Sequence, residues 1–209
     1  VGFGVECVLP SGEVGTGNGQ GGGEVLSGAG ILIGDSLMVG VKPHLSSLLG
    51  AGKVASGSDA KGGTTIQQWA PKVKDMVTNS TPKPEVAFVI LGTNNITGSD
   101  VGALVKSVST DLKSAGVKQV VWVGTPHFTK STKEGGSRSA YPNIIESNTQ
   151  STNAAIKANV NGCFYDTYTA LGYKVWINDS KYNEIHPGSA GYKLWAQAIN
   201  DWYKAGNCK

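Results

Sequence analysis

Residues 30–37 read Gly-Ile-Leu-Ile-Gly-Asp-Ser-Leu, a short apolar run that stops at a glycine and is followed by an acidic and a hydroxyl side chain. Two further apolar runs lie at residues 86–91 and 120–123. Continuous apolar runs of this length are typical of strands that are covered on both faces, as in a parallel sheet. We therefore predict three central strands, the first of which ends beside Ser36.

Apolar residues at helical spacing lie between these runs. One set is Ile66, Trp69, Val73, Met76 and Val77, and a second set over residues 101–112 ends near Gly116, a residue type that commonly follows a helix. A last helix is predicted from about residue 189 to residue 205. Alternating strands and helices are typical of βαβ units. The sequence thus predicts an α/β fold, a three-layer α/β/α sandwich with a mostly parallel five-stranded sheet of the flavodoxin-like kind.

The first residues have a different composition. Glycine occupies 30 of the 209 positions and is concentrated near the N-terminus. A chain so rich in glycine buries too little apolar surface to offset the entropy of ordering it. We predict a linker or leader over residues 1–28 and one folded domain over residues 29–209. Such a linker leads us to expect a secreted or cell-surface module of a larger multi-domain protein.

Charge and residue usage argue against several classes of protein. Eighteen Lys and Arg against fifteen Asp and Glu give a net charge of +3 without a basic block, so we expect no nucleic-acid partner. No apolar run approaches the roughly 20 residues of a membrane span, so we expect no such span. The three cysteines and three histidines are widely scattered, and we expect neither a metal site nor a cofactor.

Polar residues gather where the predicted strands end, which is where open α/β sheets bind ligands. Four short blocks are Gly-Asp-Ser-Leu at 34–37, Gly-Gly-Thr-Thr at 62–65, Gly-Thr-Asn-Asn at 92–95 and Asn-Glu-Ile-His-Pro at 183–187. A serine hydroxyl becomes a good nucleophile only when a nearby base takes its proton. His186 is the base of suitable pKa in these blocks. Taken alone, Ser36 could instead cap the helix, since serine is a preferred N-cap residue.

In their order and spacing these blocks resemble those of the SGNH hydrolases, also called GDSL esterases/lipases. The resemblance implies a serine esterase that cleaves carboxylic esters through an acyl-enzyme, with Ser36 as nucleophile and His186 as base. It also implies an oxyanion hole made by the backbone N–H groups of Ser36 and Gly63 and by the side-chain amide of Asn94. Gly62 is the alternative to Gly63. We expect Asp35 to make local hydrogen bonds rather than to act as an acid.

The sequence departs from the pattern of this family at one catalytic position. The family usually has Asp three residues before the histidine, whereas this chain has Asn183. An amide can accept a hydrogen bond from the imidazole but supplies no charge. We favour Asn183 as the residue that orients His186. A backbone carbonyl, the carboxylates of Asp179 or Glu184, or a weak or inactive site are the alternatives. Asn95, where the family often has Asp, departs at a position that is usually structural.

For the substrate, we expect a small acyl group, such as acetyl, on a carbohydrate or cell-wall polymer. His127, Trp69 and Tyr141 are the predicted substrate-binding residues. The rings of Trp69, Tyr141 and Trp176 could stack on sugars. A lipase, a thioesterase or an acyltransferase could use the same Ser–His pair. From a different class, a non-catalytic carbohydrate- or envelope-binding module could keep the fold. Cys163 and Cys208 are expected either to form a disulfide or to remain free thiols.

Overall fold

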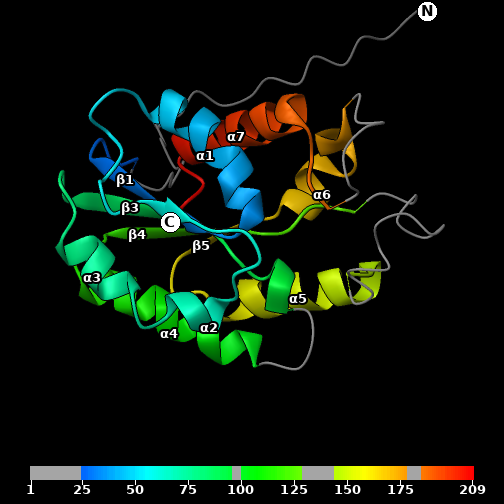
Figure 1. Ribbon diagram of the computed structural model, residues 1–209, viewed down its shortest axis with the longest axis horizontal. Helices are drawn as coiled ribbons and strands as arrows, with labels where there is room; N and C mark the ends of the chain where they lie inside the picture. The colour runs from blue at the N-terminus through cyan, green and yellow to red at the C-terminus, as the bar shows by residue number, and fades with distance from the viewer. Residues whose placement is uncertain (1–24, 96–99, 129–143, 178–184) are drawn as a thin grey trace, which may run out of the picture.

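The computed structural model describes residues 25–95, 100–128, 144–177 and 185–209. Its centre is a five-stranded sheet of order β2-β1-β3-β4-β5, in which every neighbouring pair is parallel (Figure 1). The strands are β1 (Ala29–Gly34), β2 (Asp59–Ala60), β3 (Pro84–Ile90), β4 (Gln119–Val123) and β5 (Cys163–Tyr165). The predicted α/β class and five-stranded parallel sheet are confirmed.

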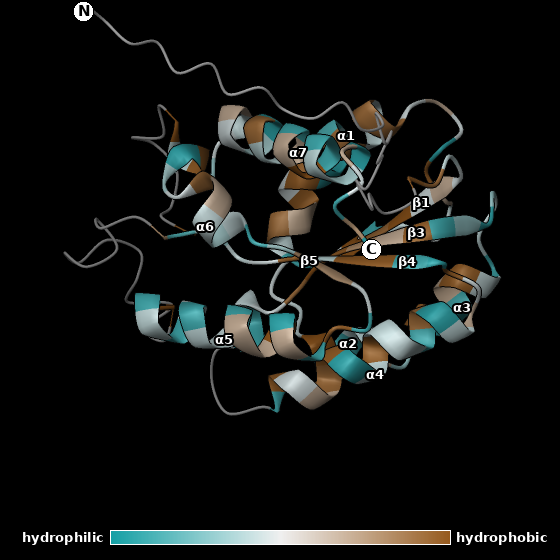
Figure 2. Ribbon diagram, turned by 180° about the vertical axis from the view of Figure 1, so that it is seen from behind, coloured by the Kyte–Doolittle hydropathy of each residue, from teal (hydrophilic) through white to brown (hydrophobic). Residues whose placement is uncertain are grey.

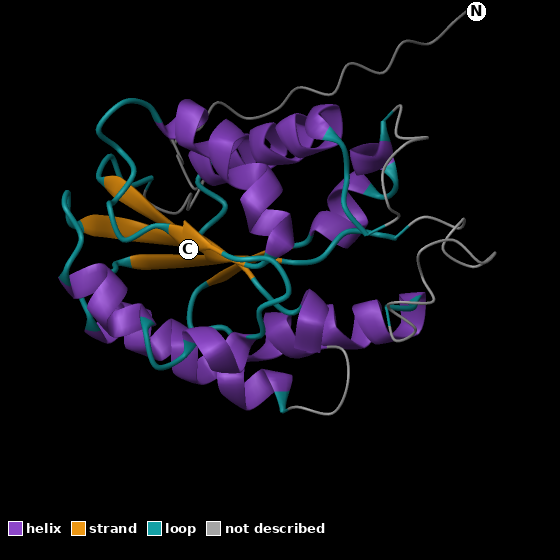
Figure 3. Cartoon of the chain, in the orientation of Figure 1, coloured by secondary structure: helices purple, strands orange, loops and turns teal. Residues whose placement is uncertain are grey.

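Helices cover both faces of this sheet (Figure 3). On one face lie α1 (Ser36–Leu49), α6 (Thr167–Leu171), the short 3-10 helix η4 (Lys174–Trp176) and α7 (Ser189–Lys204). On the other face lie α2 (Ile66–Trp69), α3 (Val73–Thr78), α4 (Val101–Ser114) and α5 (Glu146–Asn159). A further 3-10 helix, η1 (Thr93–Asn95), follows β3. The described part of the chain contains no helix long and apolar enough to span a membrane.

Two apolar cores fill the space between the sheet and its helices. Successive strand residues point to opposite faces, so Leu32 packs toward α1 and α7 while Ile31 and Ile33 pack toward the other layer. All three are fully buried. Figure 2 shows the apolar strands enclosed between helices whose outer sides are more hydrophilic. Burial on both faces explains why these strands appear in the sequence as unbroken apolar runs.

The structure differs from the expected helices in two places. The pattern from Ile66 to Val77 forms two short helices because Pro71 lies between them and cannot supply a backbone N–H to a continuous helix. The helix α5 was not predicted. Its sequence is polar, and the residues it buries include Thr149, Thr152 and Asn153.

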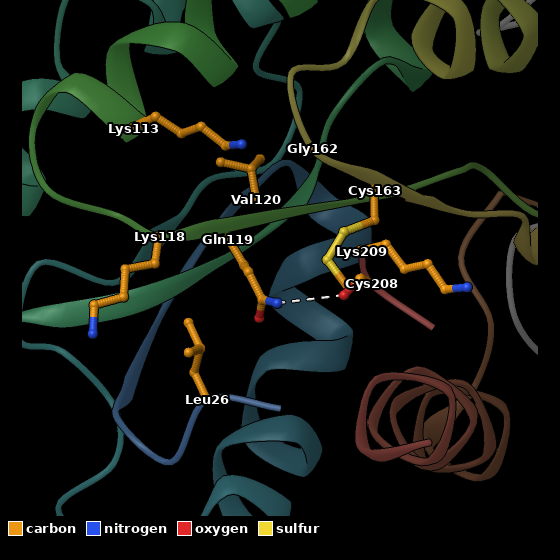
Figure 4. Close-up of a pocket in the computed structure, with 9 residues that line it drawn as sticks. All are labelled: Leu26, Lys113, Lys118, Gln119, Val120, Gly162, Cys163, Cys208 and Lys209. Atoms are coloured by element: carbon orange, nitrogen blue, oxygen red, sulfur yellow. Dashed lines mark hydrogen bonds between the residues drawn. A yellow bond between two sulfur atoms is a disulfide. The ribbon is translucent and has the colours of Figure 1, made fainter. Parts of the chain in front are cut away.

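A disulfide ties the C-terminal segment to the edge of the sheet. Cys163, the first residue of β5, is bonded to Cys208, with their Cα atoms 5.2 Å apart. Figure 4 shows the bond beside Gln119, whose amide donates to the Cys208 carbonyl at 3.4 Å. Gln119 also accepts a hydrogen bond from the Tyr203 hydroxyl, which in turn accepts one from the backbone N–H of Leu26. The last residues of the predicted linker therefore lie against the domain.

Candidate active site

Ser36 is the first residue of α1, directly beyond the end of β1. The turn between them depends on Gly34, because a Cβ atom there would overlap Met38 and the carbonyl oxygen of Ile90. The helix cap is Asp35, whose carboxylate accepts a hydrogen bond from the backbone N–H of Leu37 at 2.9 Å. The interpretation of Ser36 as the N-cap is therefore wrong, and the expected local hydrogen bond of Asp35 is confirmed.

Asp35 is fully buried beside Ser36. One carboxylate oxygen holds the helix start, while the other, Oδ2, has no hydrogen-bond partner among the described residues. Burial raises the pKa of this carboxyl from 3.8 to about 7, because a low-dielectric surrounding disfavours the charged form. Over the acidic range the group is therefore neutral, and it places no negative charge next to the serine.

His186 meets Ser36 across 150 residues of sequence. Its Nε2 atom lies 2.8 Å from the Oγ atom of Ser36, a hydrogen-bond distance. Burial lowers the pKa of the imidazole below its ordinary value of 6.5, so the ring is neutral at neutral pH and can accept a proton. Asn183, Asp179 and Glu184, the residues considered for orienting this ring, lie outside the described residues.

The segment after β2 brings glycine to the serine. The N–H of Lys61 donates to the carbonyl of Gly34 at 3.0 Å, which extends the β1–β2 pairing to the end of β1. A Cβ atom built on Gly62 would lie 3.7 Å from Cβ of Ser36, whereas one built on Gly63 would have no atom within 4 Å. Gly63 has a φ of +74° and makes the turn. The space beside Gly62 therefore opens toward Ser36, while the choice between Gly62 and Gly63 as the oxyanion-hole donor stays a prediction.

Asn94 and Asn95 connect the end of β3 to the same segment. The side-chain amide of Asn94 donates to the carbonyl of Thr64 at 2.9 Å, which uses one of its two N–H groups. The buried Asn95 side chain accepts from the backbone N–H of Ile66 at 2.9 Å and donates to Gln67 at 2.6 Å. Asn95 is thus structural, as expected, and its bonds join η1 to the start of α2.

The aromatic residues predicted to bind substrate have different surroundings. Trp69 is only 4% exposed and packs in the core, with its indole N–H donating to Thr64 Oγ1 at 2.8 Å. This corrects the expected role, since a buried ring offers no face to a sugar. Trp69 instead supports Thr64, which the sequence reasoning did not single out although it follows directly after Gly63. Tyr141 lies outside the described residues.

His127 lies in an aromatic cluster beyond the end of β4. Its ring stacks on Tyr168, with centroids 3.3 Å apart, and also contacts Tyr173. Its Nδ1 atom is 3.8 Å from a carboxylate oxygen of Glu146, and burial lowers the pKa of the ring. The His127 carbonyl accepts a hydrogen bond from the Trp176 indole at 2.7 Å. These contacts hold α5, α6 and η4 together. The substrate-binding role of His127 stays a prediction.

No group of three or more potential metal ligands occurs among the described residues. A neutral imidazole in contact with a serine hydroxyl, at a helix start and beside a glycine segment, is suited to nucleophilic acyl transfer.

Comparison with solved structures shows which fold this is. A putative SGNH hydrolase from Slackia heliotrinireducens superimposes with a TM-score of 0.62 at 18% identity, covering 83% of this chain and 98% of its own. A catalytic mutant of an acetylxylan esterase from Geobacillus stearothermophilus gives a TM-score of 0.60 at 17% identity, covering 84% and 95%.

A lipolytic G-D-S-L family protein from Veillonella parvula gives a TM-score of 0.55 at 20% identity, covering 84% of this chain and 98% of its own. No family model matches the sequence, and no curated protein sequence matches it significantly. The chain therefore has the SGNH hydrolase fold, as its four sequence blocks indicated.

Proposed function

We propose that this protein is a serine esterase that hydrolyses carboxylic esters through an acyl-enzyme. The observation that carries the proposal is the 2.8 Å contact between Ser36 Oγ and His186 Nε2 at the carboxyl edge of the sheet. The likeness of its fold to an acetylxylan esterase and to a lipolytic G-D-S-L family protein supports the same class of reaction.

In the first step, Ser36 Oγ attacks the ester carbonyl carbon while neutral His186 accepts the hydroxyl proton at Nε2. The carbonyl electron pair moves to oxygen, giving a tetrahedral oxyanion. When this intermediate collapses, the C–O bond to the alcohol breaks, and the imidazolium returns its proton to that alcohol. Water then attacks the acyl carbon while the imidazole accepts its proton at Nε2. The bond from the acyl carbon to Ser36 Oγ breaks, the imidazolium returns its proton to Oγ, and the acid is released.

Three donors are proposed to stabilise the oxyanion: the backbone N–H groups of Ser36 and Gly62, and the second N–H of the Asn94 amide. A Cβ atom built on Gly62 would lie 3.7 Å from Cβ of Ser36, and this proximity supports the choice of Gly62, with Gly63 as the alternative donor. Each such donor typically contributes about 3–4 kcal/mol to transition-state stabilisation. Asn183 is proposed to orient His186.

For the substrate we propose small acyl groups, such as acetyl, on a carbohydrate or cell-wall polymer. The acetylxylan esterase among the structural neighbours supports this class. A secreted or cell-surface setting is part of the proposal, and the Cys163–Cys208 disulfide supports it, because disulfides persist mainly in oxidising compartments. The Gly-rich residues 1–24 favour a module within a larger protein.

The test is hydrolysis of p-nitrophenyl acetate by the purified chain and by Ser36→Ala, with Ser47→Ala as a matched control from the exposed side of the same helix. We expect Ser36→Ala and His186→Ala each to lower kcat at least ~1000-fold, and Ser47→Ala to leave it unchanged. Equal slow hydrolysis by the wild type and Ser36→Ala would reject the esterase in favour of the binding module. Release of acetate from acetylated xylan then tests the substrate class.

A further inference from the structure

Ser36 is the first residue of α1, and His186 lies in the segment that leads into α7; these two helices pack against each other on the same face of the sheet (Figure 1). The helix α1 begins at Ser36, and α7 begins three residues after His186. The placement of α7 against α1 therefore sets the distance between Oγ and Nε2. Close packing at two glycines, one where α7 meets α1 and one where α7 meets η4, fixes this placement.

The first is Gly40, one helical turn after Ser36 and on the same side of α1. A Cβ atom at Gly40 would lie 2.1 to 2.4 Å from three ring atoms of Tyr192 (Cζ, Cε2 and Cε1), which is at least 1 Å inside the 3.4 Å of ordinary van der Waals contact. The Tyr192 ring is buried and lies parallel to the fully buried Trp195. It therefore cannot turn aside without displacing core side chains.

The second is Gly191, the neighbour of Tyr192 in the first turn of α7. A Cβ atom there would also lie more than 1 Å inside van der Waals contact, in this case with the carbonyl oxygen of Val175 in η4. A backbone oxygen cannot give way as a flexible side chain can. The first turn of α7 is thus fixed between α1 on one side and η4 on the other.

We propose that Gly40, Gly191 and Tyr192 form a packing lock that holds Nε2 of His186 at hydrogen-bond distance from Ser36. They are positioning residues, since they act through the placement of α1 and α7. The catalytic consequence of the lock rests on the proposed esterase function, whereas its geometric consequence does not.

Gly40→Ala tests the lock by forcing the two helices apart. Relief of the overlap requires a displacement of about 1 Å, which takes the 2.8 Å Oγ–Nε2 contact beyond the ~3.0 Å limit for a good hydrogen bond. A misplacement of about 1 Å can lower the rate ~100-fold, so we expect kcat on p-nitrophenyl acetate to fall by about that factor with KM nearly unchanged. Activity is expressed per folded protein, measured by thermal unfolding.

Two further variants separate positioning from general damage. Gly102→Ala is the matched control, because a Cβ atom there would lie 2.6 Å from the flexible amide of Asn159, between α4 and α5, and it should leave kcat unchanged. Tyr192→Leu removes the three ring atoms that a new Cβ would meet. In that background Gly40→Ala should lower kcat less than ~3-fold, since the two effects are coupled through one contact. A full ~100-fold loss in that background would overturn the lock.

A readout independent of turnover is the imidazole NMR signal of His186, assigned by its absence in His186→Ala. In Gly40→Ala the chemical shift and the pH titration midpoint of this signal should match those measured in Ser36→Ala, in which the hydroxyl partner is missing. In Gly102→Ala both should match those of the wild type. If the wild type shows no Ser36-dependent hydrolysis but the signal moves, the esterase proposal fails and the lock stands. If Gly40→Ala changes neither kcat nor the signal, the lock is wrong.

Discussion

Replacing Asp35 with asparagine should change how the stability of the protein depends on pH. The buried carboxyl has a folded-state pKa of about 7 against 3.8 for the free side chain. Asparagine can keep the cap, because its amide oxygen can accept the hydrogen bond that Leu37 donates. Its NH₂ group takes the place of the protonated Oδ2, which also lacks a partner among the described residues.

The magnitude follows from the shift in pKa. Below pH 3.8 the carboxyl is protonated in both the folded and unfolded states, and its contribution to stability is fully present. As the pH rises toward 7, the unfolded state loses the proton while the folded state keeps it, so stability is lost. Three pKa units at 1.36 kcal/mol each correspond to about 4 kcal/mol, lost between roughly pH 4 and pH 7 and constant above that range.

The assay is urea unfolding of the wild type and Asp35→Asn at pH values from 4 to 8.5. The free energy of unfolding of the wild type, relative to Asp35→Asn, should fall by about 4 kcal/mol over this range. Asp100→Asn is the control, because Asp100 caps α4 through the same kind of bond but is exposed to solvent. A difference between wild type and Asp35→Asn that stays constant with pH would refute a raised pKa for Asp35.

Three other predictions concern the site and the disulfide. The pKa of His186 is lowered, and only the neutral ring accepts the serine proton. The acid limb of the pH profile of kcat/KM should therefore have its midpoint below pH 6.5. A midpoint above that value contradicts the assignment of His186 as the base. Asn94→Ala should lower kcat ~100- to 1000-fold while the circular dichroism spectrum is retained, and an unchanged rate would remove Asn94 from the oxyanion hole. Replacing both Cys163 and Cys208 with serine should lower the free energy of unfolding by about 4 kcal/mol for a link that spans 45 residues, measured from urea titration. That variant should keep its esterase activity, since the disulfide lies at the amino end of β5.

The central strands could be predicted because a strand that is buried on both faces has a continuous run of apolar residues in the sequence. The strand β1 and residues 86–90 of β3 are unbroken apolar runs, and each run is followed within four residues by a polar residue of the site. The polar helix α5 has no such run: its buried Asn153 pairs with both backbone groups of Thr125, a tertiary contact without a helical period. The two-residue strand β2 is too short for any periodicity to show.

Within the site, residue types predicted the chemistry, but distances depended on the fold. The order of the four blocks singled out Ser36 and His186, and the structure places them 2.8 Å apart. The choice between Gly62 and Gly63 could not be made from two adjacent identical letters, since it depends on which residue turns toward Ser36. Trp69 at helical spacing fits either a core position or a sugar platform, and only its burial distinguishes them.

The wide separation of nucleophile and base along the chain has a consequence for biogenesis. During translation Ser36 would be synthesised early. The chain would nevertheless have no hydrolytic activity until α7 packs on α1 and brings His186 to Ser36. Hydrolytic activity would therefore appear only after the C-terminal helix α7 has packed against the rest of the domain. In refolding experiments, helical content should return before turnover, and the lag between the two would time the arrival of α7.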